Sequence, residues 1–284
     1  MTQSRTYAVL PSRALVRLGG ADWRGFLQGL ITQDVDGLQP GEARFAALLT
    51  PQGRLLHDLF VIGRDDGAWL DVEAAARDAF VQRLTLYRLR AKVEIAAVDA
   101  PVAVVFGEDA RPPAGPGWFR DPRLPALGWR GYAAPPPADA AQGDAADYDA
   151  WRLALGVPGP ADWGSEAAYP IEADFDLLGG VDFKKGCFVG QETTSRMKRR
   201  GQIKTRMLPI RFEGPAPTDV TTPARRSPAS TSAPASGAGP LNAIGSMRLF
   251  TWPRRFMREV VSWPTKHPFW KSMPFRRSKL ASMG

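Results

Sequence analysis

The chain has 284 residues, a formal net charge of +8 and a single cysteine. One cysteine excludes an intramolecular disulfide, and no apolar run reaches the roughly 18 residues that a membrane-spanning helix needs. The N-terminal residues contain no apolar segment typical of a secretory signal. These features predict a soluble protein in a reduced, cytoplasmic setting, with no membrane partner.

The positive charge is concentrated at the C-terminal end. Residues 214–284 hold eleven basic and two acidic side chains, so their net charge is +9, while residues 1–213 carry −1. The high isoelectric point therefore belongs to the tail, and a nucleic-acid partner is not expected of the folded part.

The first 106 residues predict mainly antiparallel strands. A turn at 51–53 separates two apolar runs, which together predict a hairpin. The clearest helix is expected at 73–89, where apolar residues recur on one face. In chain order, the other predictions are strands within 7–18 broken at Pro11, a short helix capped by Asp22, and strands at 43–50, 55–62, 68–72, 93–98 and 102–106.

Beyond residue 106 the pattern becomes weaker. We expect short strands at 118–119 and 128–132, a linker at 133–146, a helix at 148–155, an irregular stretch at 160–169 and a strand at 206–212. Residues 214–240 are almost wholly Pro, Ala, Ser, Thr and Gly, a composition that predicts a disordered linker. Residues 241–284 form a basic tail without a period of 2 or 3.6, so no regular element is predicted there.

Candidate site residues are densest in VDFKKGCFVGQETTSRMKRRGQIK, residues 181–204, which contain Cys187. A lone cysteine is more often a buried structural residue. The neighbouring lysines and arginines are also suited to lower the pKa of a reactive thiol. One thiolate cannot hold an iron–sulfur cluster, which needs about four ligands, and the two histidines give no metal-binding spacing, so no metal site is predicted.

Three other features carry two interpretations each. Gln191 and Glu192 are either a solvated helix start or an amide and carboxylate suited to a heterocycle such as a pterin. Asp58 lies among apolar residues of a predicted strand, so it is either at a sheet edge or directed into a pocket. The basic run at 196–200 is either a solvated face or a clamp for a polyanion.

The segment PIEADFDLLGGVDFKKGCFVGQETTSRMKRRGQIKTRMLPIRF closely resembles the signature of the YgfZ-type folate-binding proteins. Lys185, Gly186 and Cys187 followed by Phe188, Val189 and Gly-Gln-Glu match the hallmark of that family. The upstream segments FLQGLITQDV and LLTPQGRLLHDLFV agree as well, so the resemblance covers residues 7–212.

The resemblance implies an α+β fold like that of the aminomethyltransferase (T-protein) of the glycine cleavage system, with interwoven antiparallel subdomains around a central folate channel within residues 1–213. It implies tetrahydrofolate as the cofactor and help in assembling or repairing 4Fe–4S proteins, with iron–sulfur carrier and client proteins as partners. It favours an assembly factor over a turnover enzyme. The implied site comprises Cys187 as functional thiol, Asp58 facing the folate, and Asp34, Arg54, Lys185, Gln191 and Glu192 as further cofactor-binding residues.

The C-terminal part departs from the family pattern. No β-barrel sequence is recognisable after residue 213, and we hypothesise that residues 214–284 are translated in a shifted reading frame. Two alternative functions remain open: a folate-dependent aminomethyltransferase of one-carbon metabolism, and a polyanion-binding protein that acts through the basic tail.

Overall fold

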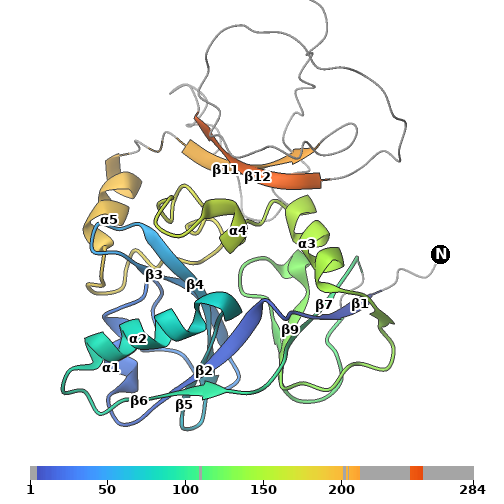
Figure 1. The fold of residues 1–284 in the computed structure, drawn as a ribbon, viewed down its shortest axis with the longest axis horizontal. Coiled ribbons are helices and arrows are strands. Elements are labelled where there is room, and N and C mark those ends of the chain that lie inside the picture. Colours follow the sequence, from blue (N-terminus) through green and yellow to red (C-terminus); the bar gives the residue numbers. More distant parts are fainter. Residues whose placement is uncertain (1–4, 109–110, 201–202, 204, 212–243, 252–284) are drawn as a thin grey trace, which may run out of the picture.

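The computed structural model describes residues 5–108, 111–200, 203, 205–211 and 244–251, and its main body contains two five-stranded sheets (Figure 1). The first sheet has the order β10-β1-β7-β9-β8, and the second has the order β3-β4-β5-β2-β6. The chain enters the first sheet with β1 (Thr6–Val9), builds the whole second sheet from β2 (Arg13–Gly19) to β6 (Glu94–Val98), and returns with β7 (Val102–Phe106). This exchange confirms the predicted interwoven subdomains.

The predicted hairpin forms one side of the second sheet. β3 (Ala43–Leu49) pairs antiparallel with β4 (Leu55–Arg64), and Ala47 lies opposite Asp58. β4 also pairs with β5 (Gly67–Glu73), so β4 is an interior strand of the sheet.

Helices cover the outer face of the second sheet. The long helix predicted at 73–89 is a 3-10 turn, η1 (Ala74–Ala76), followed by α2 (Arg77–Arg88). Phe80 and Leu84 of α2 are buried in one cluster with Leu27 of α1 (Trp23–Gln28) and Val16 of β2. A second cluster, which includes Phe45, Phe60 and Phe175, lies on the side of this sheet that faces the first one.

The segment predicted as a linker at 133–146 is partly ordered. β10 (Ala141–Gln142) pairs parallel with β1, and Asp144 accepts a hydrogen bond from the backbone N–H of Asp147 at 2.9 Å, which caps α3 (Ala145–Ala154). The Asp147 carboxylate accepts a bond from the Asp144 backbone N–H at 3.0 Å, which completes a capping box. The remaining strands of this sheet are β8 (Trp118–Arg120) and β9 (Trp129–Tyr132), with a 3-10 turn, η2 (Pro125–Leu127), between them.

The expectation of an irregular stretch at 160–169 is wrong at its start, where α4 (Pro160–Trp163) forms. Pro160 occupies the first helical turn, and Asp162 accepts a bond from the Gly159 N–H at 2.8 Å. The buried side chain of Trp163 then fixes this short helix on the core.

Near the C-terminus, α5 (Gln191–Arg200) precedes β11 (Thr205–Arg211), which confirms the strand predicted at 206–212. β11 pairs antiparallel with β12 (Ile244–Thr251), so the expectation of no regular element at 241–284 is wrong for these eight residues. β12 is held by its pairing with β11 rather than by a local pattern. The predicted linker at 214–240 and the rest of the tail lie outside the described residues. Within the described ranges, no closed C-terminal barrel is present and no helix is long and apolar enough to cross a membrane.

Candidate functional site

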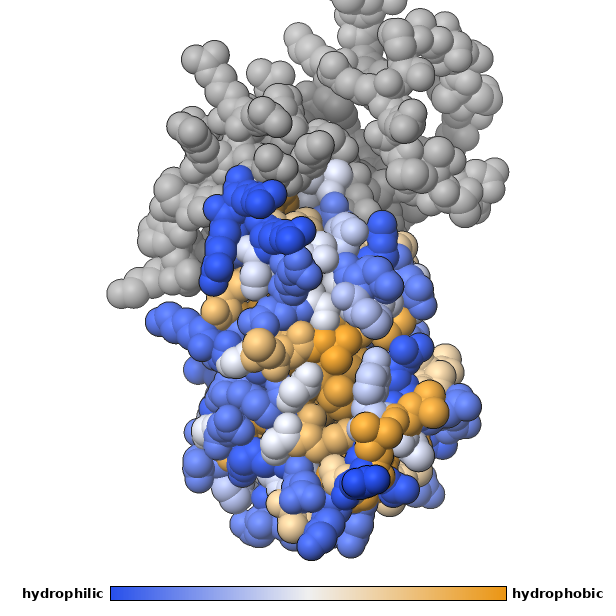
Figure 2. Space-filling view, turned by 90° about the vertical axis from the view of Figure 1, so that its left-hand side faces the viewer, coloured by the Kyte–Doolittle hydropathy of each residue, from blue (hydrophilic) through white to orange (hydrophobic). Residues whose placement is uncertain are grey.

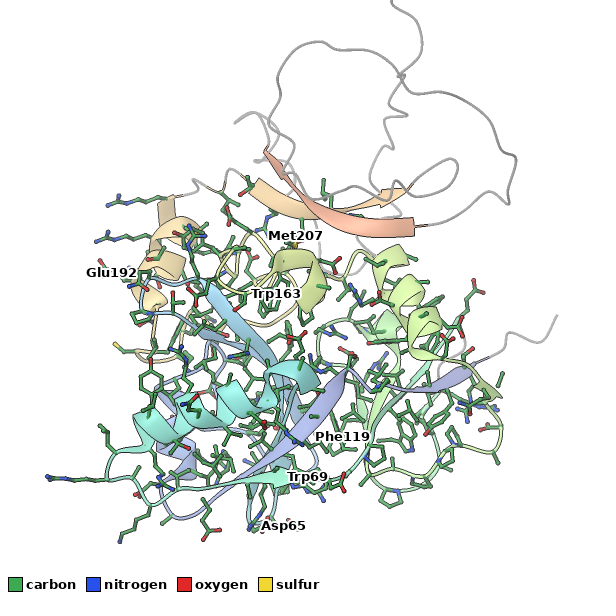
Figure 3. The ribbon with its side chains drawn as sticks, viewed as in Figure 1. Asp65, Trp69, Phe119, Trp163, Glu192 and Met207 are labelled. Atoms are coloured by element: carbon green, nitrogen blue, oxygen red, sulfur yellow. The ribbon has the colours of Figure 1, made fainter. Side chains whose placement is uncertain are left out.

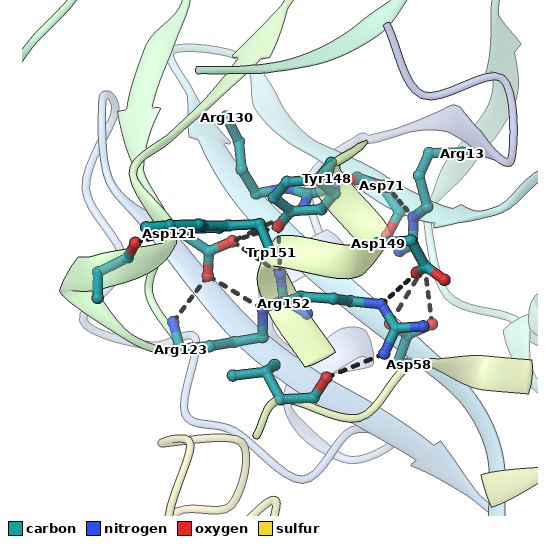
Figure 4. A network of polar contacts seen from close by, with 12 residues as sticks. Arg13, Asp58, Asp71, Asp121, Arg123, Arg130, Tyr148, Asp149, Trp151 and Arg152 are labelled. Atoms are coloured by element: carbon teal, nitrogen blue, oxygen red, sulfur yellow. Dashed lines mark hydrogen bonds and ion pairs between the residues drawn. The ribbon is translucent and has the colours of Figure 1, made fainter. Parts of the chain in front are cut away.

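Charged side chains from both sheets meet in a buried network (Figure 4). Arg13 of β2 donates from Nη1 to both carboxylate oxygens of Asp58 at 2.9 and 3.1 Å, and from Nε to Asp71 at 2.6 Å. Arg130 of β9 donates from Nη2 to the other Asp71 oxygen at 2.6 Å. Burial alone would raise the pKa of Asp71, but the Arg13 and Arg130 guanidinium groups hold it below its ordinary value.

The network extends to the Asp121 carboxylate in the loop after β8. Arg123 binds Asp121 in a bidentate way through Nε at 3.0 Å and Nη2 at 2.8 Å, and its Nη2 also donates to the Tyr148 hydroxyl at 2.9 Å. Arg130 lies 3.7 Å from the same carboxylate and so links the two halves. Three buried carboxylates are thus matched by three guanidinium groups, an arrangement that avoids an unpaired buried charge.

Five residues of this network line a cavity of about 380 Å³ between the sheets, α3 and the start of α4: Arg13, Asp58, Arg123, Arg130 and Tyr148. Because β4 is an interior strand, Asp58 is not at a sheet edge and its carboxylate belongs to the cavity wall. The Phe60 ring lies beside it, with the Arg130, Arg123 and Arg13 guanidinium carbons 4.0, 4.8 and 5.5 Å from its centroid. Further lining residues include Ser12, Glu73, Asp149, Arg152 and Gly159.

Sequence reasoning did not single out Arg13, Arg123, Arg130 or Tyr148. A usable signal existed at two of them, because Arg13 and Arg130 stand on strands among apolar or aromatic neighbours, as Asp58 does. Such charges on the inward face of a strand need partners and therefore point to one another.

Cys187 lies elsewhere, on the loop before α5, and is exposed. The interpretation of Cys187 as a buried structural cysteine is therefore wrong. It does not belong to the lining of the 380 Å³ cavity, so the structure separates the predicted thiol from Asp58. A Cβ added at the neighbouring Gly186 would meet no atom within 4 Å, so this loop faces open space.

Lys185 anchors the Cys187 loop to the body of the protein. Its buried Nζ donates to the backbone carbonyls of Gln28, Ile31 and Gln33 at 2.8, 2.7 and 2.9 Å. Burial lowers the pKa of Lys185 to about 8, although the Asp34 carboxylate nearby opposes the shift. The lysine of the Lys-Gly-Cys motif thus has a structural role, because it satisfies the last carbonyl of α1 and two carbonyls of the segment that follows the helix.

The two signature segments meet through a pair of glycines. Gly190 has a φ of +80°, and a Cβ there would lie 2.6 Å from the Thr50 carbonyl oxygen and 2.9 Å from the Gly53 Cα. Gly53, in the hairpin turn, has a φ of +86° and faces the Gly190 carbonyl in the same way. Both positions need glycine, because the left-handed conformation and the close approach each disfavour a side chain.

The other predicted cofactor-binding residues lie outside the cavity lining. Asp34 accepts hydrogen bonds from Gln28 at 2.8 Å and from Arg44 at 2.9 Å. Burial alone would raise the pKa of Asp34, but these donors hold it below its ordinary value. Arg54 donates to the Ala167 carbonyl at 2.9 Å.

Gln191 and Glu192 open α5. Gln191 Nε2 donates to the Gly186 carbonyl at 3.4 Å, and Glu192 pairs with Arg196 one turn along the helix. Figure 3 shows Glu192 at the periphery of the molecule, whereas Trp163 and Met207 point into its interior. Of the residues predicted to bind a cofactor, only Asp58 therefore faces this cavity. No group of three or more His, Cys, Asp or Glu side chains that could hold a metal ion occurs within the described part of the chain.

Comparison with known proteins gives several similar chains. The iron-sulfur cluster assembly factor IBA57, mitochondrial, of Homo sapiens is 33% identical over 245 residues, covering 75% of this chain and 68% of that protein. The IBA57 homolog of Mycosarcoma maydis is 32% identical over 228 residues, covering 72% of this chain and 57% of that protein. The chain thus spans somewhat more than half the length of the fungal relatives. No protein-family model matches the chain.

Among solved structures, the glycine cleavage system aminomethyltransferase T from Bartonella henselae resembles this fold with a TM-score of 0.57 at 15% identity, over 72% of this chain and 66% of that one. This likeness confirms the predicted α+β, T-protein-like fold. The relatives are named as mitochondrial proteins, which contradicts the expectation of a cytoplasmic setting. That expectation rested on the composition of the N-terminal residues, which is a weak guide to compartment.

Proposed function

This chain belongs to the IBA57 family of iron–sulfur cluster assembly factors, and from that premise we propose that it binds tetrahydrofolate and assists the assembly or repair of 4Fe–4S proteins. The observation that carries the folate part of the proposal is the polar cavity beside Asp58. The observation that supports the iron–sulfur part is the exposed thiol of Cys187 on an anchored loop.

The cavity fits a folate by size and by the chemistry of its walls. Its volume of about 380 Å³ falls within the usual range of small-molecule sites. A pterin ring presents N–H donors that a carboxylate such as Asp58 can accept, and Phe60 offers an apolar surface. The acidic tail of a folate needs cations, and Arg123 retains Nη1 without a hydrogen-bond partner among the described residues.

The pairing of Asp58 favours binding over turnover. Arg13 contacts both oxygens of its carboxylate, so Asp58 is held in one orientation and its charge is balanced. A carboxylate held in this way is a good fixed acceptor but a poor general base. This arrangement therefore supports an assembly factor rather than the alternative aminomethyltransferase, which shares the fold.

Cys187 suits a role in cluster chemistry because it can reach other molecules. A single thiolate cannot complete the coordination of a cluster, so further ligands would come from a carrier or client protein. The Lys185 contacts hold the loop in place while leaving the sulfur exposed.

A calorimetric titration of the full chain with tetrahydrofolate tests the folate part. We expect saturable binding that Asp58→Asn weakens at least tenfold, because the amide loses the charge paired with Arg13 and gains donors that face the ligand. Asp66→Asn, at an exposed turn, serves as the control and retains binding. Circular dichroism verifies that each variant is folded. Absence of saturable heat at millimolar ligand, or equal affinity of the two variants, would refute folate binding at this cavity.

A further inference from the structure

The end of helix α2 exposes two leucines at the margin of the molecule. Leu89 and Leu86 are 88% and 71% exposed, more than any other large apolar side chain among the described residues. Leu86 lies in the last turn of α2, and Leu89 is the residue at which the helix ends. The turn from α2 into β6 lies at the left-hand margin in Figure 1. Figure 2 views that side and shows, in its lower half, strongly apolar residues next to strongly hydrophilic ones. Residues 86–92 are here called the α2 tip.

The backbone of Leu89 is strained. Its φ is +45° and its ψ is −107°, a conformation that glycine adopts readily and a side chain disfavours. Helices commonly end at a glycine with a positive φ. A leucine at this position bears the strain, yet its side chain gains no burial within the described chain. A partner that buries the leucine would account for both features.

Cations surround the two leucines. Arg88, Arg90 and Lys92 are exposed, and the α2 tip holds no acidic side chain, so its net charge is +3. None of the three cations has an ion pair among the described residues. Arg88 donates to the Val93 carbonyl at 3.5 Å, as a cation near a helix C-terminus commonly does. The helix dipole favours such cations, but it does not explain leucines that face water.

Leu89 and the three cations converge on one shallow hollow of about 440 Å³. The acidic side chains beside it have partners within the protein. Glu94 lies 3.6 Å from Arg17, and Asp22 accepts a hydrogen bond from the Lys92 backbone N–H at 2.7 Å. The hollow therefore offers unpaired cations to an anion, and its size suits a phosphate-bearing group.

The leucines decide which kind of anion fits the α2 tip. A free phosphate or a nucleic acid would pair with the cations and leave both leucines in water. A stable protein interface buries about 800 Å² on each partner and involves about 20–30 residues a side, more than this turn provides. A bilayer surface suits a small tip, because its acyl chains receive leucines while its phosphates pair with the flanking cations.

We propose that the α2 tip binds the surface of an anionic phospholipid membrane. Leu86 and Leu89 enter the headgroup region, and Arg88, Arg90 and Lys92 pair with lipid phosphates. The rest of residues 1–213 carries −4, so a negative surface attracts the tip and repels the remaining body, which orients the protein. The sequence-based expectation of no membrane partner rested on the lack of a spanning run, which a surface contact does not need. Neither the folate cavity nor the exposed thiol takes part in this contact.

Sedimentation of the full chain with vesicles of phosphatidylglycerol and phosphatidylcholine in equal parts, at moderate salt, tests the cations. Arg90→Glu with Lys92→Glu reverses two charges of the α2 tip. Arg120→Glu with Arg199→Glu is the control, because it makes the same change in total charge at two exposed arginines outside the tip and leaves the basic tail unaltered. We expect the first variant to partition into the vesicles at least tenfold more weakly, and the control to change less than threefold.

A third double variant tests the leucines at constant charge. Leu86→Gln keeps a good helix former, and Leu89→Gly suits the positive φ, so the variant should fold, which circular dichroism verifies. We expect its partitioning into the same vesicles to fall at least tenfold, because the apolar part of the contact is lost.

Four results would overturn the proposal. The first is no vesicle binding by the unsubstituted chain. The second is equal weakening by the two charge variants, which would show attraction by total charge, including that of the basic tail. The third is unaltered partitioning of the leucine variant, which would show phosphate binding without insertion. The fourth is self-association of the unsubstituted chain without vesicles that the leucine variant abolishes, which would identify a second copy of this chain as the partner of the tip.

Discussion

Replacing Arg13 by methionine removes the guanidinium that balances Asp58 and shares Asp71. The side chains of Arg13, Asp58 and Asp71 are 8%, 6% and 0% exposed, so solvent cannot replace the lost guanidinium. Asp71 keeps Arg130 as a partner at 2.6 Å, whereas Asp58 keeps no ion pair among the described residues. One buried carboxylate is therefore left uncompensated, and such a loss costs about 3–5 kcal/mol of the free energy of unfolding.

The loss depends on pH in a direction that follows from the ion pairs. Arg13 and Arg130 hold the pKa of Asp71 below its unfolded value, so this group contributes stability above about pH 4 that disappears as the pH falls through the folded pKa. In the variant this contribution shrinks, because Asp71 keeps only Arg130 as its ion-pair partner. The difference between wild type and Arg13→Met is therefore largest near pH 7 and decreases toward pH 4.

Urea unfolding followed by circular dichroism measures both quantities. Arg17→Met is a matched control, because Arg17 lies on the same strand and pairs with the exposed Asp66 and Glu94. It should destabilise the protein much less, since solvent screens its ion pairs. If Arg13→Met is no more destabilising than Arg17→Met, or if its effect is the same at pH 4 and pH 7, the buried network does not stabilise the fold through its ion pairs.

Three further predictions concern the loop and the C-terminal strands. Gly190→Ala should lower the free energy of unfolding, measured by chemical denaturation, by more than about 1 kcal/mol, because the φ of +80° and the Thr50 carbonyl oxygen both oppose a Cβ. Gly186→Ala is the control and should be nearly neutral, because a Cβ at Gly186 meets open space. Equal effects of the two variants would contradict the contact between the two signature segments. Lys185→Met should lower the free energy of unfolding by about 2–4 kcal/mol, because three carbonyls lose their donor, and unchanged stability would contradict the anchoring role. Burial raises the pKa of Asp174 to about 7, although Arg206 donates a hydrogen bond to its carboxylate. The contribution of Asp174 to stability is therefore complete below about pH 4 and is lost as the pH rises through about 7. Asp174→Asn should remove this component from the pH profile of the free energy of unfolding, and an unaltered profile would exclude a contribution from Asp174.

Local patterns in the sequence were sufficient for part of the fold. The hairpin of β3 and β4 and the strand β11 follow from alternation and turn residues, as predicted. α4 was missed although Pro160 and Asp162 are ordinary signals of a helix start. β12 had no detectable pattern, because its pairing with β11 joins segments that are far apart in the chain.

The candidate site shows the same limit more sharply. Asp58 was found because a carboxylate among apolar neighbours is unusual, but its partner Arg13 is 45 residues away. The carbonyls that Lys185 binds are more than 150 residues from it in sequence. No periodicity encodes such pairs, so the resemblance to a family placed Lys185 at a cofactor site, whereas its contacts are those of a structural anchor.

The most direct test of the iron–sulfur role is the activity of aconitase, a 4Fe–4S enzyme, in cells whose own copy of this gene is replaced by Cys187→Ala. The exposed position of Cys187 predicts that the variant protein folds and accumulates normally, because truncating an exposed side chain leaves no cavity in the core. Aconitase activity should nevertheless fall well below that of cells with the wild-type chain. Wild-type aconitase activity together with normal accumulation of the variant would contradict a functional thiol and, with it, the proposed role in 4Fe–4S assembly.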